Sequence, residues 1–562
     1  MLDNNFKLST IPYKRFTIED FENRGREILK EFKEASSGEE QFAVHKKYYK
    51  LIQEMMTTKI LVQLRHDGDV TDKFYEDEQD YYDEISPKVE SFDTEYKKQL
   101  YNSKFRPYLE EKIGSIAFKD IEFNLKSFSD SIISLKQEEN ALTSQYAKLV
   151  AQIKIYFRGE TLNLSLLSKY KTSKDRNVRI EATEARNKAL AEIQDKFDDI
   201  YDKLVKNRTK QAQMLGYKNY VELGYYNMGR TTYGINEVRK LRDQVKKYLV
   251  PFADKIHEER RKRLGLNKLD AIDEGIYFKD GNPAPYGTAE DIFKAGKKMY
   301  SELSPETNEF FNFMLDHELF DVLGRTNKAA GGYMDMLFTY KAPIIFANFN
   351  GTNHDVHVIT HESGHAFQGY ITRNDEIMEH NNIKMETAEI HSMSMEFFTD
   401  KWAELFFKDT ADDFVKLHFE DSITFIPYGC MVDEFQEIIY SKPELTKEER
   451  RAVWQDLERQ YRPYLNFEHD TFSGEGRRWQ LQTHIFMSPF YYIDYAIAQT
   501  CALQFKIKMD ENYEDAWAKY LAFCKESAKD SLQNMLRNVG LNSPFDENYI
   551  KNIISVLEKN IK

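Results

Sequence analysis

Apolar residues recur at intervals of three and four over long stretches of the chain, with charged residues between them. This spacing places apolar side chains on one face of a helix, so it predicts helices over residues 18–34, 42–64, 81–101, 140–156 and 175–215. The texture changes at 344–349, a short apolar run bounded by Pro343 and Gly351, which predicts a strand. The pattern therefore predicts a mainly α protein with a small β-sheet.

The composition indicates a well-solvated protein with a large core. Of the 562 residues, 41% are hydrophobic and 31% are charged, and the mean hydropathy is −0.66. No run approaches the roughly 20 apolar residues of a membrane-spanning helix. A chain of this length is expected to form two or three structural units. Its net charge of −14 disfavours a nucleic acid or an anionic membrane surface as partner.

The cysteines and the first residues bear on the cellular compartment. Cys430, Cys501 and Cys524 are odd in number and far apart, so no disulfide framework is expected. The first residues show no basic segment followed by an apolar run, so no secretory signal is expected. Both observations predict a cytoplasmic protein.

The sequence His361-Glu362-Ser363-Gly364-His365 has the residue types and the spacing of a metal site on a helix. Because His361 and His365 are four residues apart, their imidazoles project from one helix face and can reach the same zinc ion. Glu362 is expected beside the open coordination position, where it can take a proton from the attacking water. The alternative interpretation is a buried helix with two hydrogen-bonded histidines and a surface glutamate.

The third ligand separates the classes of zinc peptidase that share this motif. The metzincin extension needs Gly at 368 and His at 371, but the chain has Gln368 and Ile371, so that class is excluded. A glutamate from a following helix is then expected. Residues 385–398 are predicted to form that helix, and spacing alone does not choose among its glutamates. A second glutamate is expected to orient a ligand. The candidates are Glu376, Glu379, Glu386, Glu389 and Glu396.

At this point the chain resembles a known family. The motif at 361–367, Ala388-Glu389-Ile390, Gly331-Gly332-Tyr333 and the segment 484–495 resemble the oligoendopeptidase F branch of the thimet oligopeptidase and neurolysin superfamily. The resemblance covers about residues 170–555 and is strongest to the Pz-peptidase type. It implies that His361, His365 and Glu389 bind one zinc ion per chain, that Glu362 is the general base, and that Glu396 supports the ligands. His391 departs from the family pattern and is expected to pack nearby.

The resemblance also implies donors for the oxyanion of the tetrahedral intermediate. The family uses a histidine and tyrosines downstream of the zinc helix, which implies that Tyr495 contacts the oxyanion and His484 the scissile group, with Tyr492 beside them. His484 is expected to lead one aromatic helix on which Tyr492 and Tyr495 share a face. The alternative interpretation is an ordinary aromatic core.

Three smaller expectations concern residues around this site. The strand 344–349 is predicted to be a sheet edge that pairs with an extended substrate. Residues 472–477 are predicted to form a mobile loop, because they contain two glycines within three positions. His354 and His357, just before the motif, are expected to have at most a supporting role.

The family resemblance implies two helical lobes around a deep substrate channel, with the small sheet beside the metal helix, as in gluzincin-type zinc peptidases. We expect residues 1–170 to form an N-terminal helical lobe and 171–562 a catalytic region that completes both channel walls. The predicted activity is endopeptidase cleavage of short unfolded peptides during cytoplasmic peptide degradation. Two competing hypotheses are a non-catalytic helical peptide-binding protein that retains a zinc site, and a metallohydrolase acting on a non-peptide bond.

Overall fold

The computed structural model describes residues 6–329, 331–526 and 528–560. Helices dominate these residues and the strands are few and short, which confirms the mainly α fold. The chain forms two compact units, each assembled from three separate segments. Unit 1 comprises Met1–Leu125, Ala284–Asp412 and Gln504–Leu541; unit 2 comprises Lys126–Pro283, Asp413–Leu503 and Asn542–Lys562. The expected division at residue 170 stays a prediction.

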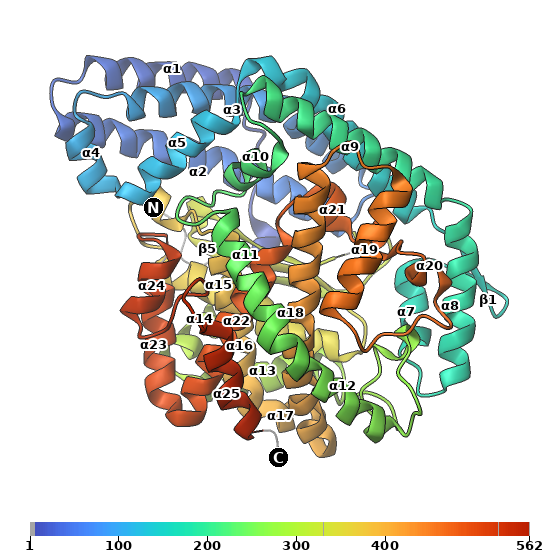
Figure 1. The fold of residues 1–562 in the computed structure, drawn as a ribbon. Helices are drawn as coiled ribbons and strands as arrows, with labels where there is room; N and C mark the ends of the chain where they lie inside the picture. The colour runs from blue at the N-terminus through green and yellow to red at the C-terminus, as the bar shows by residue number, and fades with distance from the viewer. Residues whose placement is uncertain (1–5, 330, 527, 561–562) are drawn as a thin grey trace. The chain divides into compact units, whose positions relative to one another are not determined.

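Unit 1 begins with a helical bundle in which α1, α2 and α3 pack against one another (Figure 1). Its core is largely aromatic, with Phe21, Tyr82 and Tyr96 fully buried. Helix α1 begins where the side chain of Thr17 accepts a hydrogen bond from the backbone N–H of Asp20, which satisfies one of the free donors of the first turn. The helices are α1 (Ile18–Glu34), α2 (Gly38–Gly68), α3 (Lys73–Tyr101), α4 (Arg106–Ile113) and α5 (Ser115–Ser127).

The sheet of unit 1 has three strands, β3 (Phe320–Leu323), β4 (Tyr333–Leu337) and β5 (Ala342–Phe349), in the order β3-β5-β4. The predicted strand 344–349 is present as part of β5, but its prediction as a sheet edge is wrong. Strand β5 pairs in parallel with β3 and antiparallel with β4, so its hydrogen-bonding groups are occupied on both sides. The edges of this sheet are β3 and β4.

Among the remaining helices of unit 1 is α15, which carries the metal motif. Helix α15 packs on β5, on α16 and on α23. The predicted sheet beside the motif helix is therefore present. These helices are α13 (Ala289–Leu303), α14 (Pro305–Asp316), α15 (Asn353–Thr372), α16 (Met385–Thr399), α17 (Ala403–Phe407), α23 (Tyr513–Glu526) and α24 (Leu532–Asn538).

Unit 2 is helical apart from one hairpin of β1 (Ile155–Phe157) and β2 (Glu160–Leu162). The predicted helix 140–156 is wrong at its C-terminal end: α6 stops at Ala151 and Tyr156 lies in β1. The predicted helix 175–215 is interrupted and forms α8 and α9. The helices of the first and last segments are α6 (Ile133–Ala151), α7 (Leu164–Lys171), α8 (Arg176–Ala191), α9 (Gln194–Met214), α10 (Tyr220–Asn227), α11 (Ile235–Gln244), α12 (Val250–Leu264) and α25 (Tyr549–Asn560).

The middle segment of unit 2 contributes α19 (Lys447–Tyr461), α20 (Thr471–Gly474) and α21 (Thr483–Met487). Helices α18 (Ala411–Ser441) and α22 (Tyr492–Glu511) each continue from one unit into the other. Residues 472–477, expected as a mobile loop, include the packed helical turn α20. A Cβ at Gly476 would lie 2.5 Å from the Arg451 carbonyl oxygen, so close packing explains this glycine.

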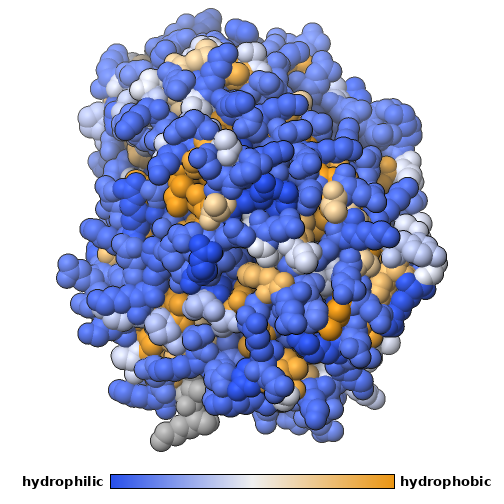
Figure 2. Space-filling model, turned by 45° about the vertical axis from the view of Figure 1, so that its right-hand side comes forward, coloured by the Kyte–Doolittle hydropathy of each residue, from blue (hydrophilic) through white to orange (hydrophobic). Residues whose placement is uncertain are grey.

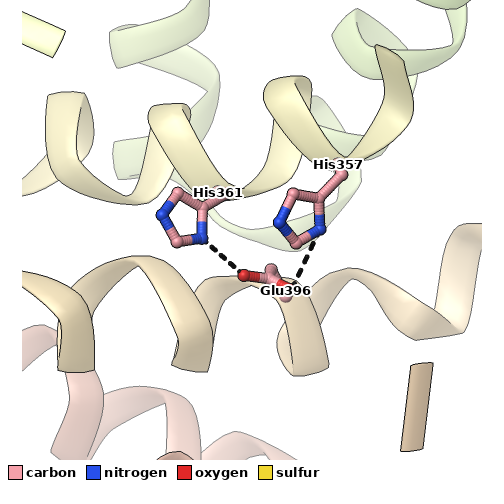
Figure 3. A group of neighbouring side chains, drawn as sticks. All are labelled: His357, His361 and Glu396. Carbon is pink, nitrogen blue, oxygen red and sulfur yellow. Dashed lines mark hydrogen bonds and ion pairs between the residues drawn. The ribbon is translucent and has the colours of Figure 1, made fainter. Parts of the chain in front are cut away.

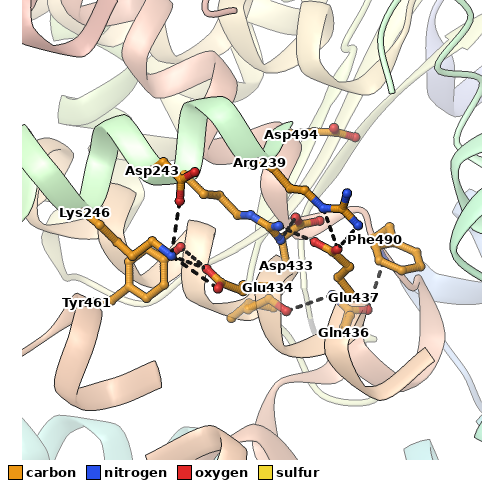
Figure 4. A network of polar contacts seen from close by, with 12 residues as sticks. Arg239, Asp243, Lys246, Asp433, Glu434, Gln436, Glu437, Tyr461, Phe490 and Asp494 are labelled. Carbon is orange, nitrogen blue, oxygen red and sulfur yellow. Dashed lines mark hydrogen bonds and ion pairs between the residues drawn. The ribbon is translucent and has the colours of Figure 1, made fainter. Parts of the chain in front are cut away.

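Ion pairs hold α11 and the π-helical turn after it, Val245–Leu249, against α18 (Figure 4). Arg242 Nη1 lies 2.9 Å from the buried Asp433 Oδ2, and Lys246 Nζ lies 3.1 Å from Glu434 Oε2. On the same stretch of α18, Gln436 Oε1 accepts a hydrogen bond of 3.0 Å from the backbone N–H of Phe490. Helix α18 thereby anchors the turn that precedes α22.

The visible face in Figure 2 is mostly hydrophilic, with hydrophobic residues in small groups. Among the described residues, no helix is long and apolar enough to cross a membrane. Cys430, Cys501 and Cys524 are buried, and no disulfide joins them.

Candidate metal centre

The start of α15 is fixed by two side chains that bind backbone N–H groups. Thr352 caps the helix by accepting from the N–H of His354. The buried Asp355 accepts from the N–H groups of Asn350 and Gly351 at 2.9 and 2.8 Å, which holds the loop between β5 and α15. The carboxylate of the first turn also interacts favourably with the helix dipole. These contacts set where the motif begins relative to the sheet.

A glycine lets α15 and α16 approach closely at the level of the motif. A Cβ at Gly364 would lie 2.6 Å from the Ser392 Cα atom and 2.8 Å from the His391 carbonyl oxygen, both backbone atoms. Only a residue without a side chain fits there without moving a helix. The close helix packing brings the glutamates of α16 next to the histidines of α15.

His361, His365 and Glu389 form one group whose ligand atoms all lie within 4.8 Å of one another. Glu389 Oε2 is 3.4 Å from His361 Nε2 and 3.7 Å from His365 Nε2. Tetrahedral zinc with bonds of about 2.0–2.1 Å holds its ligand atoms about 3.3–3.4 Å apart, so the spacing fits zinc closely. Two imidazole nitrogens and one carboxylate oxygen are also a donor set that zinc prefers. Ser392 Oγ donates to Glu389 Oε2 at 3.1 Å and so orients this carboxylate.

Glu396 lies at the Nδ1 atom of His361 (Figure 3), whereas Glu389 lies at Nε2. His361 Nδ1 donates to Glu396 Oε1 at 2.6 Å, which leaves Nε2 directed at the group described above. The same carboxylate contacts His357, whose Nδ1 is 3.3 Å from Glu396 Oε2. His357, His361 and Glu396 thus form a second group with metal-ligating atoms within 4.8 Å. Sequence reasoning gave His357 little weight, although its position four residues before His361 places it on the motif face.

The surroundings of the two motif histidines affect their protonation in opposite ways. Burial favours the neutral form of His361, but its hydrogen bonds with Glu389 and Glu396 outweigh burial and raise its pKa well above the usual range. Burial lowers the pKa of His365, and the charge of Glu389 offsets this only in part. His365 is therefore held in the neutral form that a metal ligand requires.

The other predicted glutamates have different surroundings. Glu386 is buried on α16, but it belongs to neither of the two groups found among the described residues. Glu379 accepts from His45 Nε2 at 3.0 Å and from the phenol of Tyr49. Glu376 is exposed and pairs with Lys46. His391 is fully buried against Phe523, in agreement with the expectation that it packs.

In unit 2, the structure brings His484 together with the predicted tyrosines, but not on one helix. His484 lies on α21, and the chain turns at residues 488–491 before α22 begins. Phe490 in this turn has a φ of +68°, a left-handed conformation that ends any continuous helix. The ring centroid of His484 is nevertheless 5.0 Å from that of Tyr492 and 5.8 Å from that of Tyr495.

Helix α22 is fixed at its first turn by a buried ion pair. Arg230 Nη2 lies 2.7 Å from Asp494 Oδ1, and both side chains are almost completely buried. Tyr492 and Tyr495, on either side of Asp494 in the sequence, have ring centroids 5.5 Å apart. Burial raises the pKa of Tyr492, so its phenol keeps its proton and can donate a hydrogen bond.

Two family models match this chain. One, described as the peptidase M3 N-terminal domain, matches residues 8–128; the other, described as peptidase family M3, matches residues 169–554, which is more than half of the chain. The chain belongs to peptidase family M3. The prediction of a peptidase of this superfamily is thereby confirmed.

Individual proteins similar to this M3 peptidase agree with the assignment. An oligoendopeptidase F homologue of Borreliella burgdorferi (strain ATCC 35210 / DSM 4680 / CIP 102532 / B31) is 28% identical over 293 residues. That match covers 49% of this chain and 47% of the relative, so it spans about half the length of the curated protein.

Solved structures match this M3 peptidase over nearly its whole length. A structure of Pz peptidase A with an inhibitor is 44% identical, with a TM-score of 0.93 and 98% of each chain covered. An oligoendopeptidase F from Bacillus anthracis str. Ames is 42% identical, with a TM-score of 0.88, covering 98% of this chain and 97% of that one. These matches confirm the mainly α fold.

Proposed function

We propose that this M3 peptidase is a zinc endopeptidase that hydrolyses short unfolded peptides in the cytoplasm. His361, His365 and Glu389 hold one zinc ion per chain, and Glu362 is the general base. The observation that carries this proposal is the fit of the three ligand atoms to tetrahedral zinc, with separations of 3.4 and 3.7 Å from Glu389 Oε2. Relatives named oligoendopeptidase and Pz peptidase support peptides as substrates.

Glu362 performs the proton transfers of the reaction. Zinc, when bound, supplies Lewis-acid polarisation of the peptide carbonyl and acidifies water. Glu362 follows the first ligand on α15 and is partly exposed, so its carboxylate can take a proton from the attacking water. The same group then returns the proton to the leaving amine, which leaves Glu362 ionised for the next cycle. Glu396 holds His361 with Nε2 directed at the metal group.

The proposed mechanism also includes hydrogen-bond donors to the oxyanion. Tyr495 stabilises the oxyanion of the tetrahedral intermediate, and His484 and Tyr492 assist it. The family resemblance and the close grouping of these rings within unit 2 support the assignment. Each side chain carries an N–H or O–H group that can donate a hydrogen bond to the developing oxyanion.

The test combines metal analysis with cleavage of internally quenched peptides of several lengths. We expect one zinc per wild-type chain and cleavage of short peptides. Glu362→Gln should retain the zinc but lose on the order of 10²–10⁴ in kcat, because only the proton acceptor is removed. A wild-type protein that binds zinc and cleaves none of the peptides would refute the peptidase proposal and favour a peptide-binding protein.

A further inference from the structure

His484 is the end of a chain of polar contacts that runs through unit 2. Gln482 Nε2 lies 2.9 Å from His484 Nδ1, and Gln482 Oε1 accepts a hydrogen bond of 2.8 Å from the phenol of Tyr428. The guanidinium of Arg478 lies against the ring of Tyr428, and Arg478 in turn pairs with Glu274. The order of contacts is Glu274, Arg478, Tyr428, Gln482 and His484.

The orientation of the Gln482 amide decides what His484 Nδ1 can do. A reversed amide would place its oxygen at His484 and its NH₂ group at Tyr428. In the reversed amide the phenol hydrogen of Tyr428 would need another acceptor, and the nearby guanidinium groups of Arg462 and Arg478 have donors and no acceptor. With the amide as it stands, the phenol donates to Gln482 Oε1 at 2.8 Å. The NH₂ group of Gln482 therefore faces His484.

The position of the rings makes this orientation stable. Two guanidinium groups lie near the Tyr428 ring, with Arg462 Cζ 5.1 Å and Arg478 Cζ 5.0 Å from its centroid. Tyr428 also packs edge-on against Tyr492, at 5.8 Å between centroids. A phenol ring packed against these three side chains has little freedom to turn away from Gln482.

An imidazole nitrogen that receives a hydrogen bond must be unprotonated. Because the Gln482 N–H points at Nδ1, a neutral His484 carries its hydrogen on Nε2. In this tautomer Nε2–H is a donor. The unprotonated nitrogen, Nδ1, already accepts the hydrogen bond from Gln482 and is not available as a base. The tautomer decides whether His484 gives a hydrogen bond to an intermediate or removes a proton from it.

We propose that Gln482 is a positioning residue that holds His484 in the Nε2–H tautomer, so that His484 donates a hydrogen bond to the tetrahedral intermediate and Glu362 alone acts as base. This assignment deepens the proposed function and rests on it for the identity of the intermediate. The tautomer itself is a property of unit 2 and can be observed without any cleavage assay.

The test is nitrogen NMR on the zinc-loaded full chain with ¹⁵N-labelled histidine. The signals of His484 are identified as those lost in His484→Gln. At pH 9 we expect an unprotonated Nδ1 and a protonated Nε2 in the wild type. In Gln482→Glu a carboxylate replaces the NH₂ group, so the hydrogen should move to Nδ1. Gln455→Glu is the matched control, since Gln455 binds the Gly474 carbonyl oxygen elsewhere in unit 2.

Cleavage gives a second readout that a merely structural role would not produce. At pH 9, Gln482→Glu should lower kcat on the order of 10²–10³-fold, the usual effect of losing one oxyanion donor, with little change in KM or zinc content. A protonated Nδ1 in the wild type, or an unprotonated Nδ1 in Gln482→Glu, would overturn the proposal. If Gln482→Glu does not fold, two other spectra still test the tautomer of His484. One is that of the wild type, and the other is that of Tyr428→Phe, in which a mixture of tautomers is expected. Absence of cleavage with the expected spectra would refute the peptidase function alone.

Discussion

Glu386 and Glu389 are both buried and lie three residues apart on α16, yet they differ in what they contact. Glu389 is grouped with the two motif histidines and accepts a hydrogen bond from the hydroxyl of Ser392. Glu386 is outside the metal-ligating groups of the described residues. The two residues therefore allow the proposed ligand to be compared with a neighbouring buried carboxylate of the same kind.

Replacing Glu389 with Gln should lower zinc affinity by more than about 100-fold, because a ligand has at least the effect of a supporting residue. Replacing Glu386 with Gln should leave zinc affinity nearly unchanged. Competition with a chelator, followed by metal analysis, measures both. Loss of zinc from Glu386→Gln but not from Glu389→Gln would reverse the ligand assignment.

We expect Glu396 to affect metal binding through His361. Glu396→Gln removes the charge that accepts from His361 Nδ1 and should reduce zinc affinity about 10–100-fold. The control is His357→Gln, which contacts the same carboxylate from a side chain that is 46% exposed. Zinc affinity of this control should stay at the wild-type value. An equal loss in both variants would instead assign His357 a direct part in metal binding.

The helices and strands differ in how well the sequence predicted their positions and bounds. Helix α1 matches its predicted range because its local signals agree on the bounds. The apolar spacing covers the helix, Thr17 caps its start, and the chain leaves the helical conformation after Glu34. The motif helix was predicted for the same reason, since its signal is local. The family resemblance supplied the choice of Glu389, which spacing on α16 alone did not provide.

Long-range pairing and backbone conformation explain the failed predictions. Strand β5 becomes the central strand through β3 and β4, and local hydrophobicity does not reveal strand partners. The left-handed Phe490 separates α21 from α22, although nothing in its residue type favours that conformation. Residues 155–162 form a hairpin through Arg158 and Gly159, both with positive φ, whereas the predicted helix 140–156 extended into its first two residues.

The contact between α15 and α16 can be tested with two glycines of one helix. Gly364→Ala places a Cβ against the backbone of α16, so it should destabilise the fold by about 1–3 kcal/mol and weaken zinc binding. In Gly369→Ala the new Cβ meets Met336 Sδ at 2.9 Å, and this flexible side chain can move away. Urea unfolding and zinc titration should therefore show a clearly smaller effect at Gly369. Equal effects would mean that the close approach at Gly364 does not position the ligands.

At the scale of the whole molecule, a buried histidine outside the metal centre makes stability depend on pH. His257 stacks on Tyr464 with ring centroids 3.4 Å apart. Burial, with further contributions from Arg260 and Arg462, lowers its pKa to about 2. The unfolded chain takes up a proton near the usual value of about 6.5, whereas the folded chain does not. The stabilisation is complete above pH 6.5 and is lost as the pH falls below it.

This group alone should reduce the free energy of unfolding by up to about 1.4 kcal/mol per pH unit below pH 6.5. His257→Phe keeps an aromatic ring against Tyr464 and removes the titration, so its stability should fall less between pH 6.5 and 5. The exposed His354→Gln is the control and should follow the wild-type curve. Urea midpoints across this pH range measure the effect, and parallel curves for all three proteins would contradict it.

The segmented make-up of unit 1 has a consequence for protein synthesis. Helix α23, from the last segment of unit 1, packs on α15 and α16, which carry the proposed ligands. Tyr520 on α23 donates to the His391 carbonyl oxygen at 2.8 Å. The ribosome has made most of the chain by the time α23 is translated, long after His361 and Glu389. A nascent chain stalled before residue 513 therefore contains every proposed ligand but lacks the helix that packs behind them. We therefore expect zinc to bind stably only after α23 has been translated and has packed behind the proposed ligands. Gene fragments that stop before α23 should yield protein without a stable metal centre.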